Sequence, residues 1–546
     1  KPLSDDYSYQ PQIFFAQRPS YFVTASSMYG RGLTADLCGG PLRLDPLRRK
    51  LISMARKTVK AENKDFVPTG VLGLDKILYG GLPSNRFVVV QGPPGTGKTT
   101  LGLHYLLSGV QLGERVLFIT LAQTESELRR AARSYGFSLE GIEIHALEPG
   151  EVMRRLGQQQ DIFPTSEVEL SEVTDLIKDI VIRVKPTRLV FDTVGDIRLL
   201  SDNAYLYRQQ IIALRQFLEG FDCTSLLLDI SSIGSDDTDL QALSDGVIRL
   251  ERTTPDYGDK RYRLHVQKMR GMDFHGGFHD YSIYDKGLEV YPRTVVSKVS
   301  SPPSLGDSVK SGCDSLDKML DGGPEPGTAC LLLGPSGVGK TTLATLYAHT
   351  AAERGERSAL FLFDERPNTF KKRAQALRLD LSPHLDAGRT TIDEVNVGVM
   401  SPGEFAHKVQ SEVDKGARLI VIDSLTGYLV AMPQERLLIA QMHELLTALS
   451  RRGVLTLFTV AQHGLAGGLE EDIDISYLAD TVVQLSYFRR WGYICKSLAV
   501  IKKRFGPHDN AVRELHISSE GITVGEVVDS VDGLALRKPD HADPNG

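Results

Sequence analysis

Short apolar runs of strand length alternate along this chain with longer segments whose apolar residues recur at helical spacing. The runs are 87–91, 115–120, 188–192 and 225–230 in the first half, and 330–334, 358–363, 418–423 and 454–460 in the second. Apolar strands separated by amphipathic helices are typical of a mostly parallel, twisted sheet with helices on both faces. We therefore predict two large α/β domains, with helices that include 99–109, 206–218, 342–354 and 435–451.

The two halves are copies of one unit. The octapeptides GPPGTGKT at 92–99 and GPSGVGKT at 334–341 are 242 residues apart, and the same offset relates Gly80-Gly81 to Gly322-Gly323. A constant offset over many positions indicates duplication of a whole domain. The predicted organisation is a poorly ordered extension at 1–65, a first domain at 66–294, a linker at 295–308, a second domain at 309–525 and a polar tail at 526–546.

Each octapeptide follows an apolar run and precedes a helical segment, as a phosphate-binding loop (P-loop) requires. Its glycines let backbone N–H groups curl around a β-phosphate, where the helix N-terminus adds partial positive charge. The alternative, a glycine-rich turn with a chance Gly-Lys-Thr, is disfavoured because the pattern occurs twice. We predict nucleotide binding by Gly92, Gly95, Thr96, Gly97, Lys98, Thr99 and Thr100, and by Gly334, Gly337, Val338, Gly339, Lys340, Thr341 and Thr342.

A bound nucleotide carries Mg²⁺, which must be held from two sides. The hydroxyls of Thr99 and Thr341 are suited to one side. Asp192 and Asp423 each end an apolar strand at matching places in the two halves, and we predict that they serve the other side. An aspartate that only caps the following helix is the alternative for either one alone.

Composition narrows the class of protein. The chain has 546 residues, 41% of them hydrophobic, and no apolar run near the length that spans a bilayer, so we expect no membrane role. Five cysteines without a Cys-x-x-Cys pair predict neither a disulfide framework nor a zinc site, and fit a reducing cytoplasm. The formal charge is −6, and residues 1–65 are basic, so the body is acidic and disfavours a nucleic-acid partner.

The P-loops, the two strands that end in aspartate and two later basic clusters together resemble the KaiC-type circadian-clock ATPases, which are tandem RecA-like domains. The resemblance covers about residues 65–524 and includes KMRG at 268–271. It implies ATP with Mg²⁺, a homo-oligomer of hexameric ring form, regulatory protein partners, and cations supplied to each ATP by the neighbouring subunit. By position these cations are Lys268 and Arg270 in the first half and Lys502 and Arg504 in the second, where Phe505 replaces the family's glycine.

In that family a pair of carboxylates after the second sheet strand orients or deprotonates the attacking group. The second half has Asp364-Glu365 there, whereas the first half has Ala122-Gln123. Glutamine can orient water but cannot accept its proton. We therefore expect catalysis by Asp364, Glu365, Lys340, Lys502 and Arg504, and slow or no hydrolysis in the first half. Glu125 is the one nearby substitute, although its position predicts a solvated charge at a helix start.

The resemblance also implies adjacent Ser and Thr phospho-acceptors in the second domain. Ser476 keeps the serine position and Tyr477 replaces the threonine, so a two-site phosphorylation cycle is not expected. Two interpretations of Ser476 are equally supported: it is a phospho-acceptor with Glu365 as the base, or it is an ordinary loop serine.

Three functions stay open at this stage. The favoured one is a KaiC-like ring ATPase with clock-like or signalling roles, with serine autokinase activity in its second tier as an open addition. The second is a nucleic-acid motor of the RecA or helicase type, which needs a basic surface with aromatic side chains; the acidic stretch GSDDTD within 231–245 would instead repel a phosphate backbone. The third is a signalling scaffold that ATP assembles.

Overall fold

The computed structural model describes residues 65–147, 166–199, 204–230, 238–255, 258–294, 306–396, 398–430, 437–461 and 476–528. All of the described residues belong to one compact unit. Nearly all of the predicted extension and tail, most of the linker and the start of the acidic segment at 231–245 lie outside the described residues.

The first half contains β1 (Phe66–Val67), α2 (Leu72–Ile77), β2 (Leu82–Pro83), β3 (Phe87–Gly92), α3 (Lys98–Gln111), β4 (Val116–Thr120), α4 (Glu125–Ser134), β5 (Ile142–Ala146), α6 (Ser166–Val184), β6 (Arg188–Asp192), α7 (Val194–Leu199), α8 (Ala204–Glu219), β7 (Thr224–Ile230), α9 (Thr238–Leu243), β8 (Gly246–Thr253), β9 (Arg261–Met269), β10 (His279–Tyr284) and β11 (Gly287–Tyr291).

The second half contains α10 (Asp314–Met319), β12 (Ala329–Gly334), α11 (Lys340–Glu353), β13 (Arg357–Leu362), α12 (Pro367–Ala376), α13 (Ser382–Asp386), β14 (Thr390–Glu394), α14 (Pro402–Asp414), β15 (Ala417–Asp423), α15 (Leu425–Val430), α16 (Leu438–Arg451), β16 (Leu455–Ala461), the 3₁₀ turn η1 (Ser476–Leu478), β17 (Thr481–Arg490), β18 (Tyr493–Lys503), β19 (Arg513–Ser518) and β20 (Gly521–Val527).

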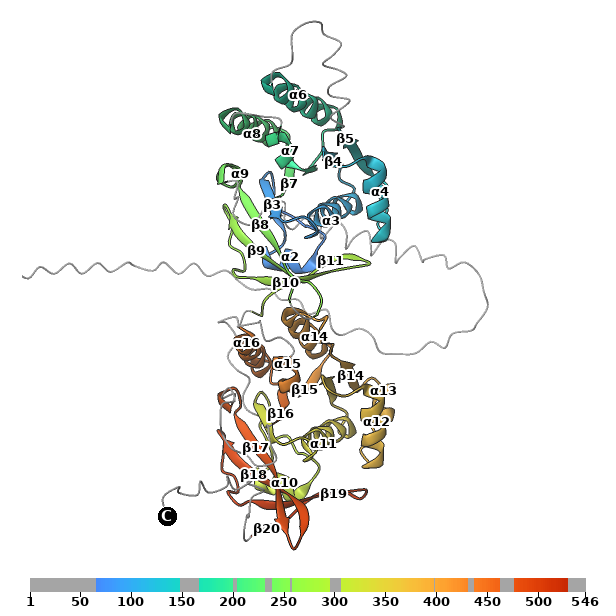
Figure 1. Cartoon of the computed structure of the whole chain (residues 1–546), viewed down its shortest axis with the longest axis vertical. Coiled ribbons are helices and arrows are strands. Elements are labelled where there is room, and N and C mark those ends of the chain that lie inside the picture. The colour runs from blue at the N-terminus through green and yellow to red at the C-terminus, as the bar shows by residue number, and fades with distance from the viewer. Residues whose placement is uncertain are drawn as a thin grey trace, which may run out of the picture. The chain divides into compact units, whose positions relative to one another are not determined.

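Each half is built on a nine-stranded sheet (Figure 1). The orders are β11-β10-β9-β8-β3-β7-β6-β4-β5 and β14-β13-β15-β16-β12-β17-β18-β19-β20. In the first sheet the strands from β8 to β5 pair in parallel, and β8 to β11 pair antiparallel. The second sheet repeats this arrangement. The predicted mostly parallel α/β fold is confirmed, and all eight predicted strands and four predicted helices lie within three residues of their expected bounds.

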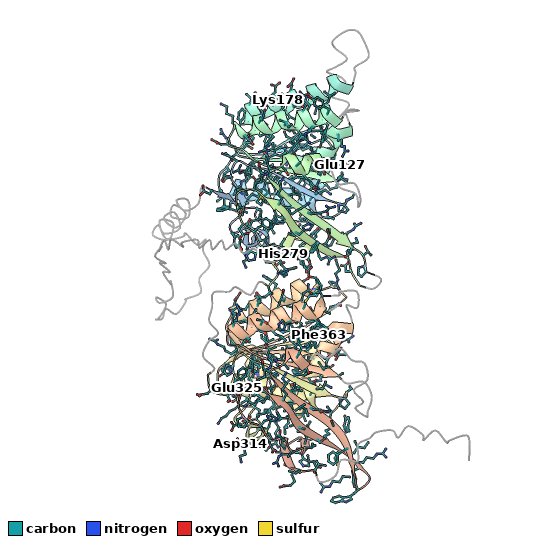
Figure 2. All side chains as sticks on the ribbon, turned by 90° about the vertical axis from the view of Figure 1, so that its left-hand side faces the viewer. Glu127, Lys178, His279, Asp314, Glu325 and Phe363 are labelled. Carbon is teal, nitrogen blue, oxygen red and sulfur yellow. The ribbon has the colours of Figure 1, made fainter. Side chains whose placement is uncertain are left out.

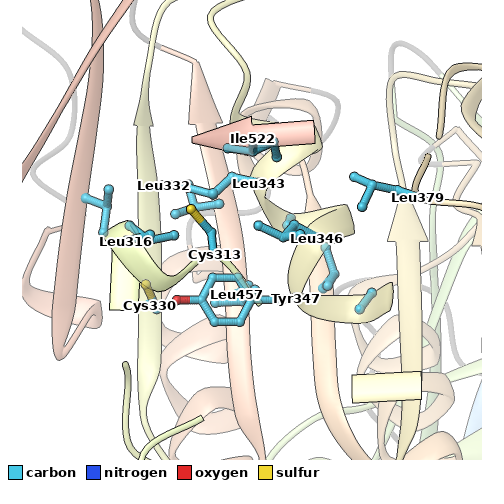
Figure 3. Packing of buried hydrophobic residues seen from close by; sticks show 14 of the residues in the cluster. Cys313, Leu316, Cys330, Leu332, Leu343, Leu346, Tyr347, Leu379, Leu457 and Ile522 are labelled. Atoms are coloured by element: carbon cyan, nitrogen blue, oxygen red, sulfur yellow. The ribbon is translucent and has the colours of Figure 1, made fainter. Parts of the chain in front are cut away.

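Both faces of each sheet are buried, because apolar side chains alternate between them. In β3, Val88 and Val90 belong to one buried cluster, and Phe87 and Val89 belong to another. In the second half, the leucines of α11 pack with β12 and β16 on one face; Leu332, Leu343 and Leu457 are labelled in Figure 3. Leucines of α16 fill the opposite face, so the leucine spacing in this helix belongs to the core.

Aromatic rings continue the core of the second half beyond the sheet strands. Phe363, which follows β13 and is labelled in Figure 2, packs edge-on against the rings of Phe405 and Tyr428. Its two chain successors are the predicted carboxylates Asp364 and Glu365, so this packing fixes the strand end from which they project.

Two further expectations concern membrane-spanning segments and the state of the cysteines. Among the described residues, no helix combines the length and apolarity that crossing a membrane would need. Four cysteines lie in the described ranges, and all four are free thiols; Cys38 lies outside these ranges.

Candidate functional site

Both P-loops follow a central strand, at the carboxyl edge of its sheet. β3 lies between β8 and β7, and β12 lies between β17 and β16. Gly95 and Gly97 adopt positive φ angles of 76° and 83°, and Gly337 and Gly339 adopt 76° and 123°. L-residues with side chains rarely adopt this conformation. The glycines therefore let each loop turn its amides inward before the helix begins.

The P-loop lysines lie over their own loops. The Nζ atom of Lys98 donates hydrogen bonds to the carbonyls of Gly92 (2.7 Å) and Pro93 (3.0 Å). Lys340 makes the same pair of contacts one domain later, at 2.8 Å and 2.8 Å. Burial lowers the pKa of both ammonium groups, while nearby aspartates oppose the change. Phosphate charge next to a desolvated ammonium group would restore its ordinary pKa.

In the first half, the groups predicted to hold Mg²⁺ lie together. Thr99 Oγ1 donates to Asp192 Oδ2 at 2.8 Å, and the Gln123 amide donates to the same oxygen at 3.3 Å. A hydroxyl beside a carboxylate is an oxygen donor set that suits Mg²⁺. Glu125 is the first residue of α4, half exposed and paired with Arg129 at 2.6 Å, which agrees with a solvated helix-start charge.

In the second half, a carboxylate-rich group replaces the glutamine. Asp364 accepts a hydrogen bond from Ser424 Oγ at 2.5 Å, and Asp423 accepts one from Thr459. Both aspartates are close enough to Lys340 to oppose the lowering of its pKa. The structure thus brings Asp364, Asp423 and Lys340 into one pocket.

Glu365 faces the same region but is held by an arginine that the sequence did not single out. Arg373 of α12 binds its carboxylate through two nitrogens, at 2.6 Å and 3.3 Å. The position 242 residues earlier is Ala131, so the first half has no matching arginine. The only feature of the sequence that could have indicated this contact is the position of Arg373, a basic residue about two helical turns after the candidate base Glu365.

The predicted cation pairs lie far from the P-loop of their own domain. Lys268 pairs with Val247 near the amino end of β8, and Lys502 pairs with Val482 near the amino end of β17. A β-bulge directly before each lysine, at Gln267 and Ile501, breaks the register in both halves. The P-loops follow the opposite, carboxyl ends of the neighbouring parallel strands β3 and β12. They begin three residues beyond the level of these lysines, about 10 Å away at about 3.3 Å per residue.

Both pairs are anchored in the same way. Lys268 donates to the Gln241 carbonyl at 2.6 Å, and Lys502 donates to the Ala479 carbonyl at 2.8 Å. Arg270 lies 3.9 Å from Asp245, and Arg504 lies 3.0 Å from Asp480; both arginines are about half exposed. Each aspartate also accepts a hydrogen bond from the first backbone amide of the central strand, at Phe87 or Ala329. Burial and the nearby Arg270 lower the pKa of Lys268. These cations are therefore placed at the edge that faces away from their own P-loop.

Ser476 begins η1 at this same edge, and its carbonyl accepts a hydrogen bond from Lys502 Nζ at 3.1 Å. The neighbouring Tyr477 is half exposed. Ser476 and Glu365 thus lie at opposite edges of one sheet, so the two do not meet within a single domain.

Two tyrosines that sequence reasoning missed fasten the P-loops from outside. Tyr281 of β10 donates its hydroxyl hydrogen to the Thr96 carbonyl at 2.7 Å, and Tyr487 of β17 donates to the Ser336 carbonyl at 3.2 Å. The two halves use different strands for this contact, so an offset search between the repeats could not have found it.

Two tandem P-loop domains on mostly parallel sheets, each with a strand-end aspartate beside the loop, define an ATPase of the RecA-like class. The family model for KaiC ATPases matches residues 67–295 and again residues 309–529. The chain therefore belongs to the KaiC ATPase family.

Curated relatives agree with this assignment over most of the chain. It is 26% identical to circadian clock protein KaiC2 of Synechocystis, over 84% of this chain and 81% of that protein. It is also 26% identical to the circadian clock oscillator protein KaiC of Parathermosynechococcus lividus (84% and 84%) and 27% identical to that of Synechococcus elongatus (83% and 88%).

Proposed function

We propose that this protein binds ATP in both halves, assembles into a ring, and hydrolyses ATP chiefly in the second half. The observation that carries the proposal is the asymmetry of the two pockets. Asp364 and Glu365 follow β13 beside Lys340 and Asp423, whereas Ala122 and Gln123 follow β4 in the first half.

In the second pocket, each residue has a role that its position supports. The amides of loop 334–339 and the ammonium group of Lys340 would hold the β- and γ-phosphates. Thr341 and Asp423 would hold Mg²⁺, which neutralises phosphate charge when bound. The Glu365 carboxylate would separate from Arg373 and accept the proton of the attacking water. Asp364 would keep that water in place.

In the first pocket, the same phosphate and Mg²⁺ contacts are supported, because Thr99 and Asp192 lie 2.8 Å apart beside Lys98. Gln123 occupies the place of the general base. Since an amide cannot accept the proton, we propose that the first half holds ATP mainly for assembly.

Arg252 lies beside Gly95 of the first P-loop, and Arg373 is paired with Glu365 in the second half, but the cations that the family resemblance assigns to the γ-phosphate do not reach the P-loop of their own domain. Lys502 and Arg504 lie at the far edge of the sheet, where a neighbouring copy's nucleotide would meet them. A ring, hexameric by family resemblance, would close every pocket in this way. Lys268 and Arg270 would serve the first tier.

We propose serine autokinase activity in addition to ATP hydrolysis. Ser476 lies beside Lys502, so a neighbour's ATP that meets this cation would also approach the serine hydroxyl. Glu365 of that neighbour would then be the base. Clock-like regulation through protein partners is proposed on the names of the relatives alone.

The test is purified full-length protein with radiolabelled ATP, resolving released phosphate from phosphate retained on the chain. Glu365→Gln should lower phosphate release about a hundredfold, as loss of a general base typically does, and Lys340→Ala should do the same. Glu125→Gln is the matched control, with release unchanged. Wild-type release in Glu365→Gln would place hydrolysis in the first half and contradict the proposal.

Retained phosphate tests the kinase part separately. Phosphopeptide mapping should find phosphate on Ser476 in the wild type and none nearby in Ser476→Ala. Phosphate on Tyr477 alone would contradict the serine assignment. A strong rise in turnover on adding single-stranded DNA would instead support the motor of the RecA type.

A further inference from the structure

A cluster of two histidines and one glutamate lies in the second half, away from the nucleotide pocket. His349 and Glu353 are four residues apart on α11, and His384 comes from α13. Residues at i and i+4 share one face of a helix. Two separate elements therefore direct three ligand-type side chains at one point.

The geometry brings the ligand atoms close together. One atom from each side chain lies within 4.8 Å of the other two. His384 Nε2 and Glu353 Oε1 are 2.8 Å apart, and the two imidazole rings meet edge to face with centroids at 5.5 Å. Ligands of a tetrahedral zinc ion at about 2.0–2.1 Å are about 3.4 Å apart, so small side-chain rotations would complete the site.

We propose that His349, Glu353 and His384 bind a divalent transition metal ion, with Zn²⁺ the fitting ion, and that this ion fastens the end of α11 to α13. Two imidazoles and one carboxylate suit zinc and its neighbours, whereas Mg²⁺ prefers an all-oxygen set. The cluster therefore selects a different metal from the one that ATP carries.

The burial of the three side chains suits a metal site that is open on one side. The His384 side chain is 6% exposed and Glu353 is 60% exposed, so an ion would have a buried anchor and an open side for entry. Asp380 also lies near His349.

One neighbour opposes the metal. Arg389 donates to His384 Nδ1 at 3.1 Å. An arginine cannot accept a hydrogen bond, so Nδ1 carries a lone pair in this arrangement and Nε2 carries the proton. A metal at Nε2 binds the neutral tautomer that carries its proton on Nδ1, so the proton leaves Nε2 and Nδ1 becomes a donor. Arg389, which is half-buried, must then turn away. Removing Arg389 should therefore strengthen the site.

The duplication supplies an internal comparison. The positions 242 residues before His349 and Glu353 are Leu107 and Gln111. The site is thus a feature of the second half alone. On α11 the site lies beyond Lys340 by about 14 Å at His349 and about 20 Å at Glu353, at about 1.5 Å per residue, and so does not overlap the proposed ATP pocket.

The experiment is a competition titration of Zn²⁺ against a chromophoric chelator, on metal-free full-length protein with excess Mg²⁺. Wild type should bind one equivalent of Zn²⁺ that Glu353→Gln and His349→Gln bind at least about tenfold more weakly. Arg389→Gln should bind it more tightly than wild type. His145→Gln is the matched control, because His145 also pairs with one glutamate, at 3.1 Å, on the surface.

Cobalt substitution checks the ligands directly. Co²⁺ in the wild type should give the visible absorption of a low-coordinate nitrogen-ligated site, and Zn²⁺ should bleach it. The exposed position of Glu353 makes Glu353→Gln a variant that should fold normally, which circular dichroism verifies. Equal Zn²⁺ affinity and stoichiometry in wild type and Glu353→Gln would overturn the proposal. The ATPase assignment is tested separately, because phosphate release from ATP by either protein would support it whatever the Zn²⁺ titration shows.

Discussion

At the residue scale, the pair Ala122-Gln123 in the first pocket stands where the second pocket has Asp364-Glu365. Gln123 and Glu365 follow equivalent strands, yet only Glu365 can accept a proton. The structure adds that each is already engaged: Gln123 contacts Asp192 at 3.3 Å, and Glu365 is bound by Arg373 at 2.6 Å. Both contacts lead to predictions.

Releasing Glu365 should speed hydrolysis. Arg373→Gln removes the ion pair that occupies the proposed base, and a partly exposed pair of this kind is worth at most about 1 kcal/mol. We expect phosphate release to rise by up to about fivefold. Lys372→Gln, one residue earlier and exposed, is the control that keeps the pair. A fall to the Glu365→Gln level would mean that Arg373 positions the glutamate for catalysis.

Adding a carboxylate to the first pocket should make its stability depend on Mg²⁺. Gln123→Glu would place a second carboxylate about 3.3 Å from Asp192, and like charges at that distance repel. We expect a lower melting temperature without Mg²⁺ and recovery with Mg·ATP, measured by thermal unfolding. Gln123→Ala is the control without the charge, and its melting temperature should respond less to Mg²⁺.

At the element scale, a strand on the antiparallel side of each sheet contacts the P-loop: β10 in the first half, and in the second half β17, which pairs in parallel with β12 and antiparallel with β18. β10 reaches the first loop through Tyr281, and β17 reaches the second through Tyr487. Ile283 and Leu288, from β10 and β11, lie close to the position that a side chain at Gly97 would need. The antiparallel extension of the first sheet thus shapes its nucleotide site as well as extending the sheet.

Loss of one tyrosine hydroxyl should loosen the first loop. Tyr281→Phe removes a buried hydrogen bond to the Thr96 carbonyl, worth about 0.5–1.5 kcal/mol. We expect a matching loss in the free energy of unfolding and weaker nucleotide binding by the first half, measured in Lys340→Ala protein so that only that site reports. Tyr79→Phe, about half exposed, should change neither quantity.

At the scale of the whole molecule, the register of the sheets separates each cation pair from its own P-loop. A cation can serve only the nucleotide that it can reach, so the proposed chemistry needs a second copy of the chain. Both Lys268 and Lys502 are anchored on backbone carbonyls that precede the strand next to the central one, which supports the same use in both tiers.

Mixing two inactive variants should restore activity. Lys340→Ala lacks a working second pocket but keeps Arg504, whereas Arg504→Ala keeps the pocket and lacks the cation. Random co-assembly should rebuild intact interfaces at about a quarter of positions, with phosphate release near that fraction of wild type. Pockets completed within one subunit would leave the mixture as inactive as its parts.

ATP in the first half should hold the assembly together. Lys98→Ala removes the charge that faces the phosphates of the proposed assembly nucleotide, so we expect smaller particles by light scattering with Mg·ATP present. Lys340→Ala is the matched control in the second half and should keep its size. A Lys98→Ala protein of unchanged size would show that the first site is not needed for assembly.

The sequence by itself determined the duplication, the eight central strands, both P-loops and the aspartates at the strand ends. These features are local, since apolar runs, glycine spacing and a constant offset need no knowledge of distant contacts. It missed β5 and β14, which lie at the sheet edges and are only partly buried, and most of the antiparallel strands, whose alternating pattern is weaker.

Only the tertiary structure decided which distant side chains meet. The contacts of Arg373 with Glu365, of Tyr281 with Thr96, and of His384 with Glu353 depend on how helices and strands pack, and no spacing in the chain encodes them. The placement of Lys502 at the edge opposite its P-loop likewise follows from strand register. Register and packing are set by the whole core, which is why they appear only when the chain is folded.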